Sequence, residues 1–249
     1  MPLSRLARLK ITEIPISASD DIGFDYLLKL SPRRRTITLE VVAGKVIVRA
    51  PKGVDRQALA SWVAQRRLWV LEKQQEQWQR ERQAVAPEYK NGGKLKWQGS
   101  EYFLRIVDGG RNAARLNGCH LEVFVGARSC ANPQTVRKIV IGWFQEQARE
   151  LLELRTYHYA EQLGVSVNQV TLRRTKTKWG HCTREGNIQY NWLIAMASRE
   201  VLDYLVVHEV CHRIYLDHSQ NYWALVESLC PDYRRLRRWL KDQGHTLML

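Results

Sequence analysis

The chain has 249 residues, 45% of them apolar, which is enough to bury the core of one large domain or of two small ones. It has no apolar run of about eighteen residues, and its first residues show neither an apolar h-region nor an A-x-A cleavage site. We therefore expect no membrane span and no secretory signal. The five cysteines form an odd set without a C-x-x-C pair, which predicts reduced thiols in a cytoplasmic protein and argues against a disulfide framework.

Positive charge dominates the composition, with 39 lysines and arginines against 25 aspartates and glutamates and a net charge of +14. Such an excess attracts anionic partners, nucleic acid first among them, although charge runs most often form solvated faces. Trp179 beside four cations gives the mixture of stacking and charge found in single-strand binders. The basic patches comprise residues 33–35, the group Arg173, Arg174, Lys176 and Lys178, and the group Arg234, Arg235, Arg237 and Arg238.

The first part of the chain predicts a small antiparallel sheet and one long helix. The predicted strands are 24–30, 36–42 and 45–49. The last two alternate apolar and polar residues on either side of Ala43-Gly44, which suits a hairpin turn. Residues 55–82 then carry apolar side chains near helical spacing, which predicts a single helix.

A Pro- and Gly-containing stretch at 87–93 indicates a linker or turn, and three short strands follow it. We expect these strands, at 94–97, 102–107 and 120–125, to continue an antiparallel meander. Pro133 opens a long amphipathic helix to about residue 163, where Gly164 is a good C-terminal stop. We accordingly expect an N-terminal β-rich region with one long helix at 1–131 and a second region at 132–249.

The second region is expected to continue with strands at 169–173 and 187–197 and then with a buried helix. Ser198 is a plausible N-cap of that helix, and Glu200 lies in its first turn. Two further helices are predicted, one capped by Ser219 and one at 232–241.

The buried helix carries the sequence H-E-x-x-H, formed by His208, Glu209 and His212. Residues four apart lie on one face of a helix, so both imidazoles can reach a single metal ion. Glu209 is placed to act as general base beside the ion. The motif predicts a catalytic metal centre.

His218 is the nearest candidate for a third ligand, because catalytic zinc takes three protein ligands and keeps one open position. The five residues between His212 and His218 are enough to end the helix and turn the chain back. Three imidazoles favour Zn²⁺ over other divalent metals. Strands followed by an H-E-x-x-H helix are typical of zinc-peptidase cores. The expected fold class is therefore α+β, with a zincin-like core in which this helix packs under a small sheet.

Several runs resemble the YgjP-like metallopeptidase family, whose relatives include SprT-like and mini-gluzincin peptidases. In the last third of the chain these runs are 177–183 (T-K-W-G-H-C-T), 186–192, 208–212, 218–223 and 230–233. Similar elements occur upstream at 34–35, 48–51, Trp69 and 99–102, so the resemblance covers nearly the whole chain. It implies a zinc-dependent peptidase.

Two positions depart from related patterns. Where the family usually has serine in a W-G-S-C run, this chain has His181, which is either a neutral variation or an added imidazole near the cleft. The metzincin motif has the same ligand spacing but carries glycine where this chain has Tyr215, and no Met-turn follows His218. The chain is therefore not expected to be a metzincin.

The first hypothesis is a zinc metallopeptidase that acts on protein or peptide substrates, including proteins associated with nucleic acid. The strand at 187–197 would pair with an extended substrate backbone. Tyr215 and Tyr222 are candidates for stabilising the oxyanion, but packing is the more common role of such rings. Asp217 is expected either to orient a ligand or to cap a helix, and Trp223 to pack the turn that carries His218.

Two alternatives belong to other classes. A metal-dependent phosphohydrolase acting on nucleoside triphosphates could use the same activated water, although no glycine-rich phosphate loop is present. A basic nucleic-acid-binding protein with a relic metal site is disfavoured, because such a site would not need Glu209.

Overall fold

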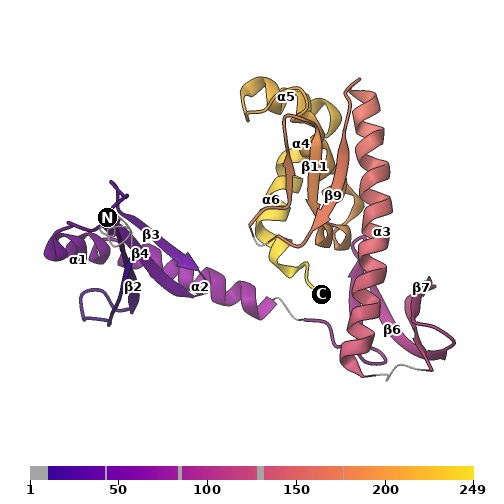
Figure 1. The fold of residues 1–249 in the computed structure, drawn as a ribbon, viewed down its shortest axis with the longest axis horizontal. Helices are drawn as coiled ribbons and strands as arrows, with labels where there is room; N and C mark the ends of the chain where they lie inside the picture. Colours follow the sequence, from indigo (N-terminus) through magenta and orange to yellow (C-terminus); the bar gives the residue numbers. More distant parts are fainter. Residues whose placement is uncertain (1–10, 43, 84–85, 128–131, 176) are drawn as a thin grey trace, which may run out of the picture. The chain divides into compact units, whose positions relative to one another are not determined.

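The computed structural model describes residues 11–42, 44–83, 86–127, 132–175 and 177–249. The chain forms two compact units, Met1–Gln83 and Ala84–Leu249 (Figure 1). This division lies well before the expected boundary at residue 131, because the strands at 94–126 pack with the C-terminal unit. The helices of the described residues are α1 (Arg56–Ala64), α2 (Arg67–Gln83), α3 (Pro133–Gln162), α4 (Arg199–Cys211), α5 (Gln220–Leu229) and α6 (Tyr233–Gln243).

The N-terminal unit has a mixed sheet rather than the antiparallel sheet expected. Its strands are β1 (Thr12–Ile16), β2 (Tyr26–Ser31), β3 (Thr38–Val42) and β4 (Lys45–Pro51), in the order β1-β2-β4-β3. β3 and β4 form the expected hairpin with Val42 opposite Lys45, although Ala43 of its turn lies outside the described residues. β2 and β4 are parallel. Alternation of side chains identifies a strand but not its partner, so the sequence pattern does not predict the parallel pair.

The helix expected at 55–82 is broken into α1 and α2. Asp55 begins α1, and its carboxylate accepts hydrogen bonds from the backbone of Gln57 and Ala58 at 2.7 and 3.1 Å. The backbone of Gln65 and of Arg66 then turns back onto the end of α1. The break lets both helices place apolar residues on the sheet, and Leu59, Val63 and Val70 are fully buried there.

The C-terminal unit contains a second mixed sheet where a meander was expected. Its strands are β5 (Lys94–Trp97), β6 (Ser100–Gly109), β7 (Ala113–Asn117) and β8 (His120–Gly126), in the order β5-β6-β8-β7. β6 and β8 are parallel, with Phe103 opposite His120. The hairpin of β7 and β8 places β8 beside β6, so these three strands do not follow their order in the chain.

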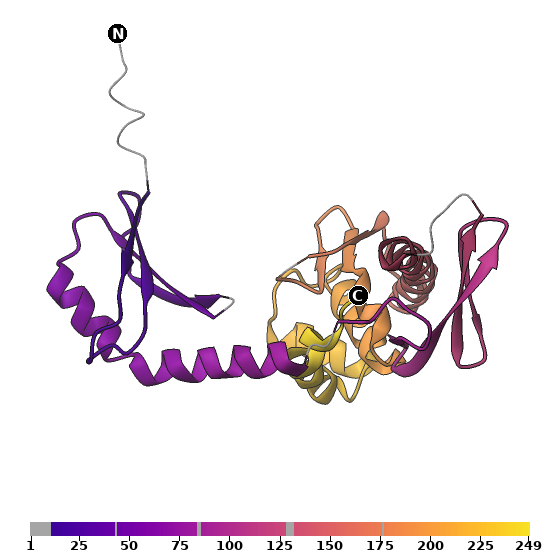
Figure 2. The same cartoon turned by 90° about the horizontal axis from the view of Figure 1, so that it is seen from below.

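α3 confirms the long helix predicted from Pro133. The Asn132 side chain caps its start by accepting from the Thr135 backbone at 2.9 Å, and Gly164 follows its end at φ +64°. Its 30 residues run from β7 and β8 of the second sheet to a further strand, β9 (Gln169–Arg173) (Figures 1 and 2). Arg155 fixes it to α4 through two bonds to Asp203, at 2.7 and 3.0 Å. None of the helices in the described residues has both the length and the hydropathy to span a membrane.

The third sheet leads directly into α4. Its strands are β9 (Gln169–Arg173), β10 (Gly180–Cys182) and β11 (Asn187–Asn191), with β11 in the middle. The strand expected to reach Ala197 ends at Asn191, whose side chain accepts from the backbone of Leu193 and starts a short 3₁₀ helix, Trp192–Met196. This segment is completely buried and delivers the chain to α4.

Candidate metal centre

α4 begins after Ser198, as expected, but the Ser198 side chain makes no capping hydrogen bond. Most of the helix is inside the core, with Val206, Val207 and Val210 fully buried. His208 and Glu209 lie in its last turns, and His212 occupies the C-cap position. The helix therefore holds these polar side chains on a framework that cannot rotate without exposing apolar surface.

The structure brings His208, His212 and His218 together. One ring nitrogen from each lies within 4.8 Å of the others. The ring centroids of His208 lie 5.1 Å from those of both other histidines, and the Nε2 atoms of His208 and His218 are 3.4 Å apart. This is the one group of potential metal-binding side chains found among the described residues.

Hydrogen bonds to Nδ1 orient two of these rings. The Tyr222 hydroxyl donates to the backbone carbonyl of His208 at 2.9 Å, so it accepts from Nδ1–H of the same residue at 2.7 Å. His212 donates from Nδ1 to the Tyr215 carbonyl at 2.9 Å. Both rings therefore carry their proton on Nδ1 and present an Nε2 lone pair, which is the form that binds a metal.

These contacts explain what the two tyrosines do. Tyr222 is fully buried, and its hydroxyl is occupied by His208. Tyr215 acts through its backbone carbonyl rather than through its ring. The sequence singled out both as candidates for oxyanion stabilisation, but it gave no signal for these contacts, because they depend on how the turn after α4 folds.

Burial keeps the imidazoles neutral. Desolvation, with smaller effects from His212 and His218, lowers the pKa of His208 to about 3. The pKa of His212 is lowered as well, mainly by burial. A divalent ion therefore does not have to displace a proton from either ring at neutral pH. The donor set fits zinc, which is commonly held by neutral imidazole nitrogen.

Glu209 is only 3% exposed and lies against the backbone of β10. Burial raises its pKa to about 8, and the nearby charge of Lys178 acts in the opposite direction. A Cβ atom added to Gly180 would lie 2.2 Å from Glu209 Oε1. Glycine at this position therefore leaves room for the carboxylate.

The turn between α4 and α5 is packed by Trp223, as expected. Its ring stacks on His218 with centroids 5.6 Å apart. The Asp217 carboxylate accepts from the backbone of Ser219 at 3.1 Å, which stabilises the turn before α5, and among the described residues it makes no hydrogen bond to the three histidines. Ser219 in turn caps α5.

β11 lies between β9 and β10, so the strand at 187–191 has no free edge for a substrate backbone. The expectation that this strand pairs with substrate is therefore wrong. β10 lies at the edge of the sheet and next to Glu209. His181 on β10 is exposed and is not part of the three-histidine group.

The raised pKa of Glu209 predicts a pH-dependent stability difference between the metal-free protein and its Glu209→Gln variant. The folded protein holds this proton more tightly than the unfolded chain, so the free energy of unfolding falls as the pH rises from 4.5 through about 8. Glutamine cannot ionise. The variant should melt higher than wild type by on the order of several degrees at about pH 8, and the gap should shrink toward about pH 5. Thermal melts of chelator-treated samples measure this, and a gap independent of pH would contradict it.

The chain was compared with protein-family models, with curated protein sequences and with solved structures. The family model "YgjP-like, metallopeptidase domain" matches residues 35–243. Curated protein sequences give no match. Among solved structures, the metallopeptidase zymogen of Pyrococcus abyssi abylysin is similar, with 21% identity and a TM-score of 0.35, covering 39% of this chain and 99% of that chain.

The family match covers most of the chain and includes His208, Glu209, His212 and His218. It also includes β10 and the segment that carries Tyr222. The chain therefore belongs to the YgjP-like metallopeptidase family and is a metal-dependent peptidase.

Proposed function

We propose that the chain is a zinc-dependent peptidase in which His208, His212 and His218 hold the metal and Glu209 is the general base. The observation that carries this proposal is the convergence of three imidazoles, two of them with Nδ1 already hydrogen-bonded, next to a buried carboxylate. A structural zinc site would normally be closed by a fourth protein ligand. The described residues offer three.

Zinc held by these rings would lower the pKa of a water molecule and polarise the scissile carbonyl. Glu209 takes the proton from the attacking water and passes it to the leaving amine. Tyr222 and the Tyr215 carbonyl keep the rings of His208 and His212 in place during this transfer. Gly180 leaves the space that the carboxylate of Glu209 occupies.

The substrate backbone would lie along β10. This strand pairs with β11 on one side, and its other side is the edge of the sheet. An extended peptide can add to such an edge through main-chain hydrogen bonds. Because Gly180 of β10 lies against Glu209, a peptide paired there would pass close to the base.

The two alternatives from the sequence receive less support. The family is one of metallopeptidases, which favours peptide over phosphoanhydride hydrolysis. A relic metal site has no use for a buried carboxylate, which destabilises the folded protein above its ordinary pKa.

Removing the base should separate metal binding from catalysis. Glu209→Gln should retain about one zinc per chain and lose peptidase activity by about a hundredfold or more. His212→Ala should lose both, because a three-ligand site cannot spare one. Metal analysis and cleavage of casein by the same samples measure this. Activity in Glu209→Gln equal to wild type, or no zinc in wild type after zinc is supplied, would refute the proposal.

Removing the Tyr222 hydroxyl should weaken metal binding without emptying the core. Tyr222→Phe keeps the buried ring but leaves His208 Nδ1 without its partner. Loss of such a supporting bond typically costs about ten- to a hundredfold in metal affinity. Competition with a zinc chelator measures it, and Tyr204→Phe is a matched control, since no hydrogen bond from the Tyr204 hydroxyl to the three histidines is present among the described residues. Unchanged affinity would contradict the assigned orientation.

Enlarging Gly180 should displace the base but not the metal. In Gly180→Ala the new Cβ collides with the Glu209 carboxylate, and a shift of about 1 Å in a catalytic group can cost about a hundredfold in rate. Zinc content should stay near that of wild type. Gly142→Ala is the matched control, because a Cβ there meets no atom within 4 Å. Full activity in Gly180→Ala would show that the carboxylate position is not critical.

A further inference from the structure

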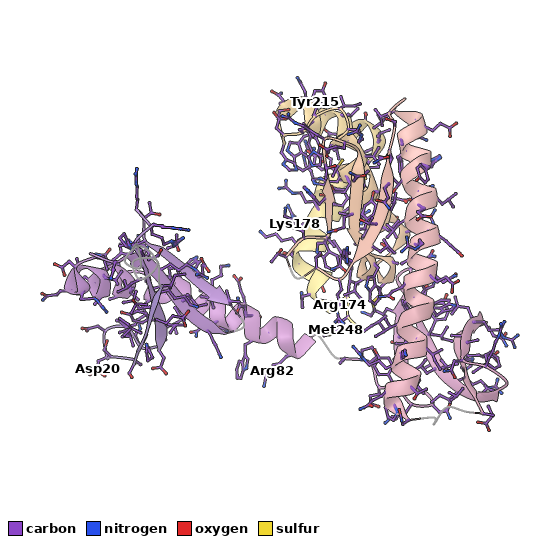
Figure 3. The ribbon with its side chains drawn as sticks, viewed as in Figure 1. Asp20, Arg82, Arg174, Lys178, Tyr215 and Met248 are labelled. Atoms are coloured by element: carbon purple, nitrogen blue, oxygen red, sulfur yellow. The ribbon has the colours of Figure 1, made fainter. Side chains whose placement is uncertain are left out.

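A basic groove lies beside the metal centre, with a volume of about 740 Å³. We define it by its four cations, Arg174, Lys178, Arg237 and Lys241. Apolar side chains, including Leu193 and Leu240, form other parts of its wall, and no carboxylate lines it. In Figure 3, Lys178 and Arg174 lie along one side of the C-terminal unit, with Arg174 close to Met248.

The cations of the groove form no close ion pairs with acidic side chains in the described residues, although Lys178 lies near enough to Glu209 to lower its pKa. Arg174 donates to the backbone oxygen of Leu249 at 3.4 Å, and Arg237 lies over the ring of Trp223. Cations gathered in a cleft with apolar walls focus the positive potential, so the groove attracts an anionic group.

The groove is connected to the metal centre by direct contacts. Tyr204 lines it, and the ring of Tyr204 lies 6.1 Å from that of His208. Arg237 lies 4.6 Å from the ring of Trp223, which stacks on His218. These contacts place the groove and the metal centre on adjoining parts of the C-terminal unit.

Two of the three other arginines of α6, Arg234 and Arg235 but not Arg238, argue against a nucleic-acid track. Arg234 is paired with Glu227 at 2.7 Å, and Arg235 with Glu200 and Asp232 at 3.0 and 3.2 Å. A bound single strand of nucleic acid needs unneutralised cations along its length. Here the carboxylates of Glu227, Glu200 and Asp232 pair with arginines next to the groove. The half-buried ring of Trp179 packs against Gly244 and also lines the groove.

We propose that the basic groove binds an acidic side chain of the peptide substrate, so that the enzyme favours cleavage of peptides with Asp or Glu near the scissile bond. The inference rests on the proposed peptidase function and adds its substrate class. A carboxylate entering the groove would accept charge-assisted hydrogen bonds from Lys178, Arg237 and Lys241.

The test uses the zinc-loaded full chain and quenched fluorescent peptides that differ only by Glu or Gln at each position near the scissile bond. Wild type should cleave the best Glu peptide with a kcat/KM about fivefold above its Gln counterpart, as expected for one ion pair with exposed cations. Lys241→Glu should abolish or invert this preference. Arg238→Glu, on the same helix and outside the groove, makes the same charge change and should retain it.

Two results would overturn the inference while leaving a peptidase in place: equal cleavage of Glu and Gln peptides by wild type, or equal loss of preference in Lys241→Glu and Arg238→Glu.

If no peptide is cleaved, the proposed function fails, and a binding experiment tests the inference separately. Labelled Glu and Gln peptides are then titrated onto zinc-loaded Glu209→Gln, with and without Lys241→Glu. Tighter binding of the Glu peptide that depends on Lys241 supports the groove. Equal binding of both peptides, with Lys241-dependent binding of a single-stranded oligonucleotide instead, assigns the groove to nucleic acid and overturns it.

Discussion

The burial of α4 is the constraint on which the rest of the site depends. Its apolar residues are enclosed by the third sheet, α3 and the two helices that follow, and Arg155 joins it to α3 through Asp203. A helix packed on several sides cannot turn about its axis. His208 and Glu209 are therefore held in fixed directions, one toward the other histidines and one toward β10. Binding a metal requires little further ordering of these groups.

The turn after α4 places the third histidine and fixes the orientation of His212. His212 closes the helix and bonds to the Tyr215 carbonyl three residues later, so the turn is tied to the ligand that starts it. α5 then places the Tyr222 hydroxyl in a hydrogen bond with His208 Nδ1, and it stacks the ring of Trp223 on that of His218. One short helix thus orients a ring on α4 and packs a ring on the turn. A change in the position of α5 would disturb both at once.

Charge is distributed unevenly around this centre. Inside the site, burial keeps His208 and His212 neutral and disfavours ionisation of Glu209. A positive charge bound nearby would therefore lower the pKa of Glu209. Outside, the basic groove presents cations with no acid among its lining residues. The acids of this region pair instead with Arg234 and Arg235 on α6. The net charge of +14 is therefore less informative than its distribution, because only some of the basic clusters remain open to a partner.

The elements that depend on local chemistry could be predicted from the amino-acid sequence. The spacing of His208, Glu209 and His212 places them on one helix, Pro133 and Gly164 bound α3, and residues 169–173 form β9 as expected. Local patterns could not determine which strands pair, so the parallel pairs β2–β4 and β6–β8 and the central place of β11 came only from the fold. The tertiary structure also decided that Tyr222 supports His208, that Gly180 makes room for Glu209, and that cations distant in sequence share one groove. Periodicity and capping act over a few residues, whereas strand pairing, burial and contacts between side chains depend on residues brought together from distant parts of the chain.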